Sequence, residues 1–319
     1  MMMMDYKKTS PDLWTGRISD QKLYMHEKVV CIEINEFVPE KNSKTIALIG
    51  YACDEGVKRN QGRIGAEKGP DAIRKSLGRF PNHLHTETQF IDFGNILCTD
   101  SNLEKTQSLF AEKIKDLLGK NIFPIVLGGG HDVAFGHYNG IKKHIGDKKV
   151  GIINFDAHFD LRSNINENTS GTPFYQIAKD AIEQQSNFNY LCLGIRKDAN
   201  DKLLYETAVD LDVKHIETNH FNMHYLEHVQ LILMQFIEDV DYVYTTIDLD
   251  GFSSAYAPGV SAPSPMGFSP DIVLESLKII IDSTKLISLD IAEMNPIYDI
   301  DGQTAKLAAS LVHFVMHNV

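Results

Sequence analysis

Short hydrophobic runs rich in β-branched residues recur along the chain, separated by longer segments with a helical spacing of apolar positions. Six runs are predicted to be buried strands: 45–51, 123–127, 150–155, 190–195, 242–247 and 286–291. Apolar residues three and four apart predict helices over 103–118, 174–182, 225–237, 272–281 and 304–315. Ser269-Pro270 marks the start of one helix, because serine caps a helix and proline suits its first position.

Strand and helix alternate in this order along the chain. The alternation is typical of an α/β fold, with a parallel sheet covered by helices on both faces. Ligands of such sheets bind at the carboxyl ends of the strands, so we expect the functional site there. No repeat, low-complexity tract or proline-rich linker marks a boundary between two large domains. We predict one main domain over residues 41–319 and an N-terminal extension over residues 1–40 that packs on it.

Composition and charge narrow the range of partners. The 319 residues contain 31 Lys plus Arg and 43 Asp plus Glu, a net charge of −12, which disfavours nucleic acids and anionic membranes as partners. The four cysteines form no CxxC pair, which argues against a thiolate zinc site and favours a reducing compartment. The start, four methionines and then polar residues, lacks the apolar core of a signal peptide, and no apolar run reaches about 18 residues. A cytoplasmic location is therefore expected.

Metal-ligating side chains follow three of the predicted strands. The run 123–127 ends in three glycines, which let the backbone approach a ligand closely, and then a histidine. The run 150–155 leads into alternating Asp, His and Asp, whose side chains would share one face of an extended backbone. The run 242–247 leads into two carboxylates two residues apart. Together the segments offer His131, Asp156, His158, Asp160, Asp248 and Asp250.

Two histidines and four carboxylates suit Mn²⁺ better than a metal that prefers thiolates. The set is large enough for two ions, and two adjacent ions can hold a shared water as a hydroxide nucleophile. The residues therefore indicate metal-assisted hydrolysis. Glu293, at the end of the run 286–291, is suited to pair with a cationic amidine or guanidine group of a substrate.

Other interpretations of these motifs compete with this one. Residues 156–167 place metal-ligating side chains at positions one, three, five and twelve of an EF-hand loop, but Leu161 stands where that loop needs glycine and a strand precedes it. His224 to His228 match the HxxEH pattern of inverted zinc proteases, although the sequence that follows is typical of an amphipathic surface helix. A ligand-binding protein of the same fold without catalysis is the non-enzyme alternative.

These segments resemble the signatures of the ureohydrolase family, which contains arginases, agmatinases and formimidoylglutamases. The matching sequences are GGGH at 128–131, DAHFD at 156–160, IDLDG at 247–251 and AEMNP at 292–296. The resemblance implies a three-layer α/β/α arginase-like fold and two Mn²⁺ ions per subunit, held by the six residues given above. It also implies that Glu293 holds the C–N group of the substrate and that Asp160 contacts a bridging hydroxide and relays its proton. Homo-oligomers are common in this family.

Three further segments resemble formimidoylglutamases in particular: LWTGR at 13–17, GYACDEGVKRNQGR at 50–63 and SGTPF at 170–174. The His-Gly pair that arginases carry after the second metal motif is missing. The resemblance implies attack of the metal-bridging hydroxide on N-formimidoyl-L-glutamate to give L-glutamate and formamide, a step of histidine degradation. Another ureohydrolase activity, on agmatine, arginine or another guanidino acid, is the alternative.

Arginines near the motifs are candidates for binding the carboxylates of such a substrate, because the guanidinium group pairs bidentately with carboxylate. Arg162 lies two residues after Asp160, Arg63 lies in a loop that contains glycine, and Arg196 follows a predicted strand. An ordinary surface ion pair is the alternative interpretation of each.

Two hydroxyl residues of the SGTPF segment are further candidates. Ser170 and Thr172 have the chemistry either to donate hydrogen bonds to a substrate or to cap the helix expected near Pro173. The partner that these predictions describe is a small amidine with two carboxylates.

Overall fold

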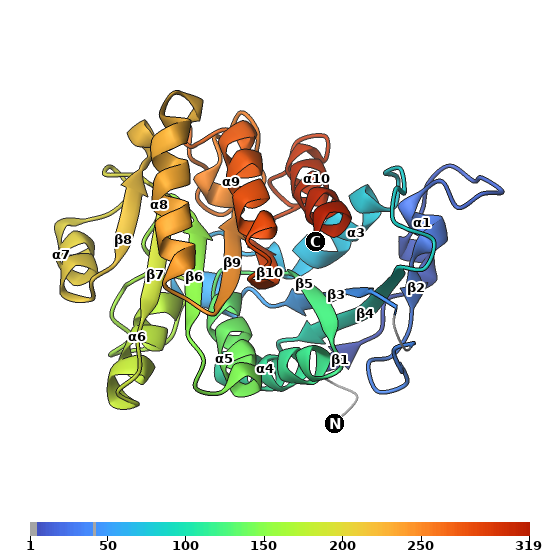
Figure 1. Ribbon diagram of the computed structural model, residues 1–319, viewed down its shortest axis with the longest axis horizontal. Helices are drawn as coiled ribbons and strands as arrows, with labels where there is room; N and C mark the ends of the chain where they lie inside the picture. Colours follow the sequence, from blue (N-terminus) through green and yellow to red (C-terminus); the bar gives the residue numbers. More distant parts are fainter. Residues whose placement is uncertain (1–4, 41–42) are drawn as a thin grey trace.

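A ten-stranded sheet runs through the molecule between layers of helices (Figure 1). The computed structural model describes residues 5–40 and 43–319. The initial four methionines lie outside this part of the chain, and the predicted boundary between residues 40 and 41 lies at its gap. The strands are β1 (Tyr6–Lys7), β2 (Val30–Cys31), β3 (Thr45–Ala52), β4 (Gln89–Leu97), β5 (Ile122–Leu127), β6 (Val150–Phe155), β7 (Asn189–Ile195), β8 (Lys214–Glu217), β9 (Tyr242–Asp248) and β10 (Leu286–Ala292).

The order of the strands in the sheet is β1-β4-β3-β5-β10-β9-β6-β7-β8, with β2 also paired to β4. Strand β1 is antiparallel to β4, and the other pairs are parallel. All six predicted strands are present, with ends within one residue of the prediction. Their continuous hydrophobic runs are explained by burial on both faces of a parallel sheet.

The helices are α1 (Met25–Lys28), α2 (Glu55–Arg59), α3 (Gly69–Leu77), α4 (Leu103–Gly119), α5 (Val133–Ile145), α6 (Pro173–Glu183), α7 (Lys202–Asp210), α8 (Leu226–Glu238), α9 (Pro270–Asp282) and α10 (Gln303–Asn318). Apolar residues of α3, α8, α9 and α10 form one core with the sheet, and those of α4, α5, α6 and α7 form a second core on its other face. This is the predicted three-layer arrangement. Among the helices of residues 5–40 and 43–319, none has both the length and the hydrophobicity that a membrane span needs.

Helix α5 was not predicted from the sequence, because glycines interrupt the spacing of its apolar residues. A Cβ atom on Gly136 would lie 2.9 Å from the carbonyl oxygen of Gln107, and one on Gly140 would lie 2.6 Å from that of Ala111. Both carbonyls belong to α4, so the two helices approach each other too closely for side chains at these positions. The glycines are therefore part of the packing, although they weaken the helical signal in the sequence.

Strand β4 also escaped prediction, because polar residues break its hydrophobic run. One of them, Asp92, is fully buried and accepts hydrogen bonds from Arg74 Nε and Nη2 and from Trp14 Nε1, each at 2.9 Å. Buried charges are tolerated when they are paired and hydrogen-bonded in this way. The bond from Trp14, whose ring packs edge-on against Phe90, also joins the N-terminal segment to the sheet.

Helix α9 begins at Pro270 with Ser269 at the capping position, as predicted. The serine hydroxyl does not bind a backbone amide of the helix, however. It donates to the carboxylate of Asp271 instead, and that carboxylate accepts a hydrogen bond from the Ile272 amide at 2.9 Å. Proline placement thus located this helix correctly, while the serine has a different hydrogen-bond partner.

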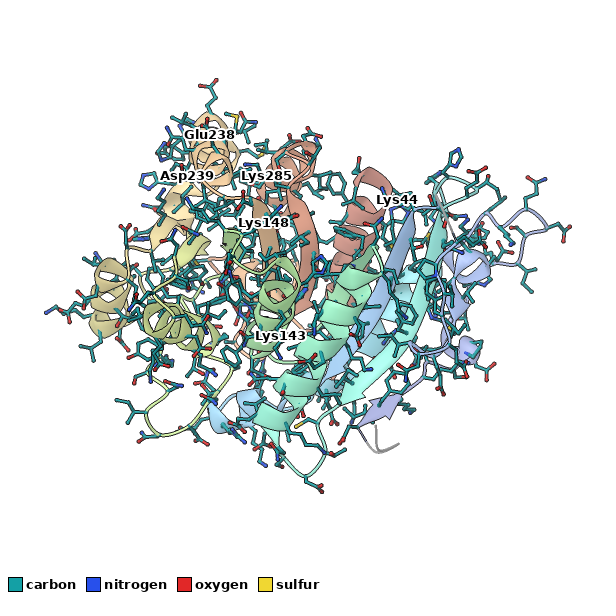
Figure 2. The ribbon with its side chains drawn as sticks, turned by 60° about the horizontal axis from the view of Figure 1, so that its bottom comes forward. Lys44, Lys143, Lys148, Glu238, Asp239 and Lys285 are labelled. Atoms are coloured by element: carbon teal, nitrogen blue, oxygen red, sulfur yellow. The ribbon has the colours of Figure 1, made fainter. Side chains whose placement is uncertain are left out.

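Lysines line the edge of the sheet at which the parallel strands begin, among them Lys44, Lys148 and Lys285 in Figure 2. Lys285 Nζ donates to the carbonyls of Ile237 at 2.8 Å and Val240 at 2.7 Å, at the end of α8. Positive side chains are favourable there, because the last carbonyls of a helix have no partner within it and carry its partial negative charge.

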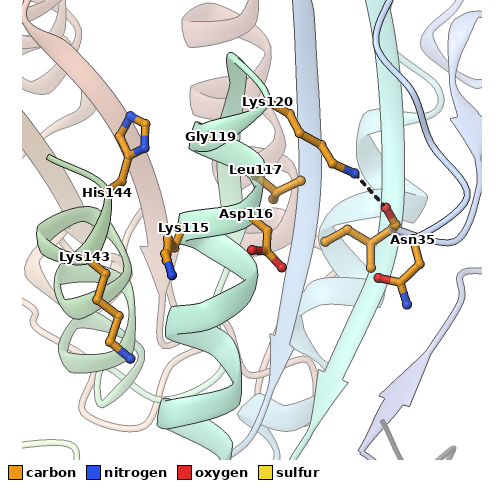
Figure 3. Close-up of a pocket in the computed structure, with 9 residues that line it drawn as sticks. Asn35, Lys115, Asp116, Leu117, Gly119, Lys120, Lys143 and His144 are labelled. Carbon is orange, nitrogen blue, oxygen red and sulfur yellow. Dashed lines mark hydrogen bonds between the residues drawn. The ribbon is translucent and has the colours of Figure 1, made fainter.

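Lysines also line a cavity of about 410 Å³ between the ends of α4 and α5 (Figure 3). Its lysines include Lys120, whose Nζ lies 3.5 Å from the carbonyl oxygen of Ile34 and 3.3 Å from that of Phe37. Lys115, Lys120 and Lys143 lie in or directly after the last turns of these two helices, where positive charge is favourable.

Two histidines join α10 to the loop after α3. His313 Nε2 lies 2.7 Å from the carbonyl oxygen of Pro81, and His317 Nε2 accepts a hydrogen bond from the His83 amide at 3.1 Å. Burial lowers the pKa of both His313 and His317 from the ordinary value of about 6.5. The unfolded chain therefore takes up protons first, so this contribution to stability is complete above about pH 6.5 and falls as the pH drops below it.

We expect the melting temperature of the wild-type chain to fall more steeply between pH 7 and pH 5 than that of a His313→Gln, His317→Gln variant. Melting curves of both proteins across this range, recorded by circular dichroism, measure the difference. Other buried groups titrate in both proteins, so only the difference between the two slopes reports on the histidines. Equal slopes would contradict the prediction.

Candidate metal centre

Four neighbouring strands in the middle of the sheet carry the predicted functional residues at their carboxyl ends. The strands β5, β10, β9 and β6 are adjacent in this order. They lead into the segments with His131, Glu293, Asp248 and Asp156, respectively. Residues that are more than 160 positions apart in the sequence therefore meet at one edge of the sheet, as expected for parallel α/β proteins.

The six predicted ligands form two groups that share Asp156. Across residues 5–40 and 43–319, these are the two places where three or more His, Cys, Asp or Glu side chains bring ligand atoms within 4.8 Å of one another. In the first group, His131 Nδ1 lies 3.2 Å from Asp156 Oδ2, 2.8 Å from Asp160 Oδ2 and 3.0 Å from Asp248 Oδ2. In the second, His158 Nδ1 lies 3.4 Å from Asp156 Oδ1 and 3.3 Å from Asp250 Oδ1.

The backbone that carries these ligands differs from the extended strand that we predicted. Strand β6 ends at Phe155, and the amide of His158 then donates to Asp156 Oδ1 at 2.8 Å. The Asp250 amide donates to Asp248 Oδ1 at 2.8 Å in the same way. Aspartate side chains favour such local turns because their oxygens compete with the backbone for its amides. The turns, and not a shared strand face, bring the carboxylates together.

Two of the candidate residues have a left-handed backbone: φ is 48° at Asp160 and 65° at Glu293. This region is sparsely populated by residues other than glycine, and such strain is concentrated at functional sites. A third unusual element is the glycine turn before His131, where a Cβ on Gly129 would lie 1.9 Å from the carbonyl oxygen of Cys53. Glycine is required there because the turn passes directly against the end of β3.

Electrostatics of the site show an excess of buried negative charge. Burial and the negative charge of Asp156 raise the pKa of Asp160 to about 6, and burial and the charge of Asp248 raise that of Asp250 well above its usual range. Burial alone would lower the pKa of His131, but the charge of Asp248 and contacts with Asp156 and Asp160 raise it well above the ordinary value. Hydrogen bonds and the charges of His131 and His158 have the opposite effect on Asp156, whose pKa lies below its usual range. Crowding of buried carboxylates in this way favours a cation between them.

A cavity of about 330 Å³ lies over this centre. The candidate ligands His131, His158, Asp160, Asp248 and Asp250 line it, together with Glu293. Apart from Leu204, its remaining wall is made of polar and small residues, including two of the three candidate arginines: Asn60, Gln61, Gly62, Arg63, Arg162, Ser170, Ala199, Ser261 and Ala262.

Comparison with known proteins identifies the family. The family model described as the arginase family matches residues 44–317, most of the chain. The chain belongs to the arginase family. A relative from Clostridium tetani named formimidoylglutamase is 39% identical over 332 residues, which cover 100% of this chain and 98% of the relative. These findings confirm the predicted resemblance.

Solved structures agree on the arginase fold. The formimidoylglutamase of Bacillus subtilis superposes with a TM-score of 0.80 at 21% identity, covering 95% of this chain and 94% of that one. A formiminoglutamase of Trypanosoma cruzi, solved with Mn²⁺, superposes with a TM-score of 0.76 at 22% identity, covering 90% of this chain and 98% of that one. At these identities, the likeness establishes the fold.

In this arginase-family chain, the candidate substrate residues differ in their availability. Arg162 is half exposed, and its nearest acidic partner is Asp201, with Nη1 and Oδ2 3.9 Å apart. Most of the Arg63 guanidinium is already engaged: its Nε and Nη2 donate to the carbonyls of Ser261 and Val260, and it stacks 3.9 Å from the ring centre of Tyr298. Arg196 pairs with Asp198 through two hydrogen bonds, at 3.1 and 2.7 Å, and does not line the cavity.

The two candidate hydroxyl residues, Ser170 and Thr172, also lie in different surroundings. Ser170 lines the cavity and accepts a hydrogen bond from Asn60 Nδ2 at 3.3 Å. Thr172 is buried outside the cavity lining, and its hydroxyl bonds within its own segment, to Thr169 at 3.0 Å and Gln176 at 2.9 Å. It precedes α6, which begins at Pro173, but its side chain caps no helical amide. Thr172 therefore supports the loop that presents Ser170.

Asn60 is a cavity residue that the sequence analysis did not single out. In the sequence, the only indication of a role for Asn60 is its position inside the segment 50–63, which resembles formimidoylglutamases. The structure shows why glycine follows Ser170 in the chain: a Cβ on Gly171 would lie 3.0 Å from Arg162 Cδ and 3.2 Å from Asn60 Nδ2. Gly171 thus leaves room for two polar side chains of the cavity.

The rival metal motifs have no support in the structure. His224 lies in a short 3-10 helix, Met223–Tyr225, ahead of α8, so the HxxEH residues are not all on the α-helix. In the EF-hand interpretation, Glu167 would be a ligand, but its side chain is half exposed and lies 3.9 Å from Arg59. Neither His224 nor Glu167 belongs to the two ligand groups found in the described part of the chain.

Proposed function

We propose that this chain hydrolyses N-formimidoyl-L-glutamate to L-glutamate and formamide, using two manganese ions held by the six residues of the two overlapping ligand groups. The observation that carries this proposal is the cavity in which these groups, the unpartnered carboxylate oxygen of Glu293 and an available arginine face a common space. The name of the C. tetani relative, which aligns over the whole chain, supports the substrate.

The residues fit a pair of manganese ions. His131 Nδ1 and Asp250 Oδ1 are buried and make no hydrogen bond, which is costly unless a cation contacts them. Carboxylate oxygens and imidazole nitrogens are ligands that Mn²⁺ accepts. Divalent cations would also neutralise the excess of buried negative charge. When bound, two such ions supply an activated water at neutral pH and stabilise charge that develops on the substrate.

Glu293 is placed to hold the reacting end of the substrate. Its Oε1 accepts a hydrogen bond from the His131 amide at 2.9 Å, while its buried Oε2 has no partner. An N–H group of the formimidoyl moiety would satisfy Oε2 with a charge-assisted hydrogen bond. This contact would orient the formimidoyl carbon, whose bond to the glutamate nitrogen breaks after water has added to that carbon.

Asp160 is placed to carry a proton. It lines the cavity and belongs to the first ligand group, beside the point at which water must add. Its carboxylate can take the proton that the attacking water loses and pass it to the departing glutamate nitrogen. Formamide and glutamate are then released without a covalent bond to the enzyme.

Arg162 and Ser170 are assigned to the glutamate end of the substrate, with Arg63 adding positive charge at the cavity wall. A dicarboxylate needs cationic partners that agmatine, which has no carboxylate, does not need. Arg162 is the most available of the candidate arginines because its ion pair with Asp201 is long and exposed. Exposed pairs of this kind contribute little, so a substrate carboxylate can replace Asp201 at small cost.

Exchange of Arg162 for glutamine is expected to raise KM for N-formimidoyl-L-glutamate by about 10- to 100-fold, with a smaller effect on kcat, because the lost contact lies away from the reacting atoms. Steady-state kinetics measure both constants. The matched control is Arg196→Gln, which removes a nearby arginine outside the cavity and should leave KM within about twofold. A similar KM for both variants would contradict the assignment.

The direct test of the function is a substrate comparison. The manganese-loaded full chain is incubated with N-formimidoyl-L-glutamate, arginine and agmatine under identical conditions, and glutamate and urea are measured. Glutamate release with no urea is expected. Urea release alone would retain the hydrolytic centre but overturn the substrate, and no product from any of the three would favour the binding-only alternative. A step in histidine degradation follows from the proposed reaction as a further expectation, and the cytoplasmic location stays a prediction from the sequence.

A further inference from the structure

A chain of buried polar side chains lies behind His131, on the side away from the cavity. Its Nδ1 faces the carboxylates of the first ligand group, while its Nε2 lies 3.0 Å from Thr246 Oγ1. The Thr246 hydroxyl in turn donates to Asp290 Oδ1 at 2.5 Å. Thr246 is on β9 and Asp290 on its neighbour β10, where the two residues are register partners.

Two further side chains, Tyr244 and His137, contact the carboxylate of Asp290. The hydroxyl of Tyr244 donates to its Oδ2, and Nδ1 of His137 lies 2.6 Å from the same oxygen. The other ring nitrogen of His137 lies 2.7 Å from Ser288 Oγ, whose hydrogen goes to the carbonyl of Pro124 at 2.8 Å. All of these side chains are fully buried. Ser288, His137 and Asp290 thus resemble a hydrolytic triad, but the serine hydrogen is already donated and Ser288 is fully buried.

Such a network is expensive to bury, and packing of the sheet does not require it. An apolar core would cover the same strands without desolvating a carboxylate and an imidazole. The network ends at the metal centre. Its last hydrogen bond reaches Nε2 of His131, while Nδ1 of the same ring is the candidate metal ligand. Hydrogen bonds of this kind select the histidine tautomer and fix the orientation of the ring.

We propose that Thr246 and Asp290 are positioning residues for the metal centre. Asp290 accepts the hydrogen of the Thr246 hydroxyl, so the oxygen of Thr246 is left to accept the Nε2 hydrogen of His131. His131 then presents a free lone pair on Nδ1 to the metal ion of the first ligand group. His158, in the second group, has no link to this network. The inference rests on the proposed dimanganese site.

The test is a measurement of manganese binding without any substrate. Thr246→Val removes the hydroxyl while keeping the shape and the strand preference of the residue. We expect it to weaken the binding of one of the two ions by about 10- to 100-fold and to leave the other unchanged. Thr246→Ser restores a hydroxyl and should bind both ions within about twofold of wild type. Equilibrium dialysis of the full chain, with metal analysis, provides the stoichiometry and both affinities.

Thr245→Val is the matched control, because Thr245 is the adjacent residue of β9, is equally buried and has a hydroxyl without a hydrogen-bond partner. A purely structural role of Thr246 would lower the melting temperature and leave both metal affinities as they are in Thr245→Val. Unchanged affinities in Thr246→Val would overturn the proposal.

A second variant keeps the proposal falsifiable if Thr246→Val does not fold. Tyr244→Phe removes one hydrogen bond to Asp290 and leaves Thr246 intact. It should weaken the binding of the same ion by about two- to tenfold. Unchanged manganese binding in this variant would overturn the proposal, whereas a wild-type chain that binds no manganese would instead overturn the proposed metal centre itself.

Discussion

Exchange of Asp156 for asparagine is expected to remove both manganese ions and to lower kcat by about three orders of magnitude or more. Asp156 is the residue that the two ligand groups share, with Oδ2 facing His131 and Oδ1 facing His158. It is fully buried, so no solvent ion can replace its negative charge. Asparagine has the same shape but no charge, and loss of the charge affects both ions at once.

Manganese content after dialysis and the shift of the melting temperature on addition of manganese are the two measurements. Ions that bind only the folded chain stabilise it, so the wild-type melting temperature should rise with manganese concentration, while that of Asp156→Asn should stay constant. Asp282→Asn, an exposed exchange at the end of α9, is the control and should behave as wild type. Two retained ions in Asp156→Asn would show that the ligand groups are assigned wrongly.

Exchange of Glu293 for glutamine is expected to lower kcat/KM by about 10²- to 10³-fold and to leave the manganese content at two ions. Burial, with the charges of Asp248 and Asp250, raises the pKa of Glu293 well above its usual range in the absence of cations. Glutamine retains an oxygen to accept the His131 amide, but it offers the substrate no negative charge. Only the contact with the formimidoyl group is lost, and its strength increases as charge develops there.

Kinetics with N-formimidoyl-L-glutamate, combined with metal analysis of the same preparation, separate this effect from loss of metal. Glu275→Gln, on the surface of α9, is a matched exchange that should leave both quantities unchanged. If Glu293→Gln keeps more than about a tenth of wild-type kcat/KM with a full metal complement, Glu293 does not hold the reacting group.

Much of the fold could be predicted because its signals are local. The buried strands are continuous hydrophobic runs, and the long amphipathic helices show their apolar spacing without reference to any other part of the chain. The elements that escaped prediction depend on their neighbours. Gly136 and Gly140 are needed because the backbone of α4 lies directly against them. Asp92 in β4 is tolerated because Arg74 and Trp14 donate hydrogen bonds to it.

The candidate metal centre could likewise be predicted only in part. The types and spacing of His131, Asp156 and Asp248 were sufficient to predict a hydrolytic metal site, because few other functions need so many ligand side chains at strand ends. Sequence could not rank the arginines, since the difference between Arg162 and Arg196 lies in their partners, a distant Asp201 and a doubly bonded Asp198. It also could not separate Ser170 from Thr172, which are two residues apart but face different surroundings.

The sequence by itself therefore determined the chemistry that this chain can perform, because metal ligands and hydrophobic periodicity are properties of individual residues and short segments. Only the tertiary structure decided which strands are neighbours and that both ligand groups share Asp156. It alone also placed Thr246 and Asp290 behind His131. The physical reason is that these relations are set by the order of strands in the sheet and by side-chain burial. Both arise when distant segments pack against each other, and neither is encoded in any one of them.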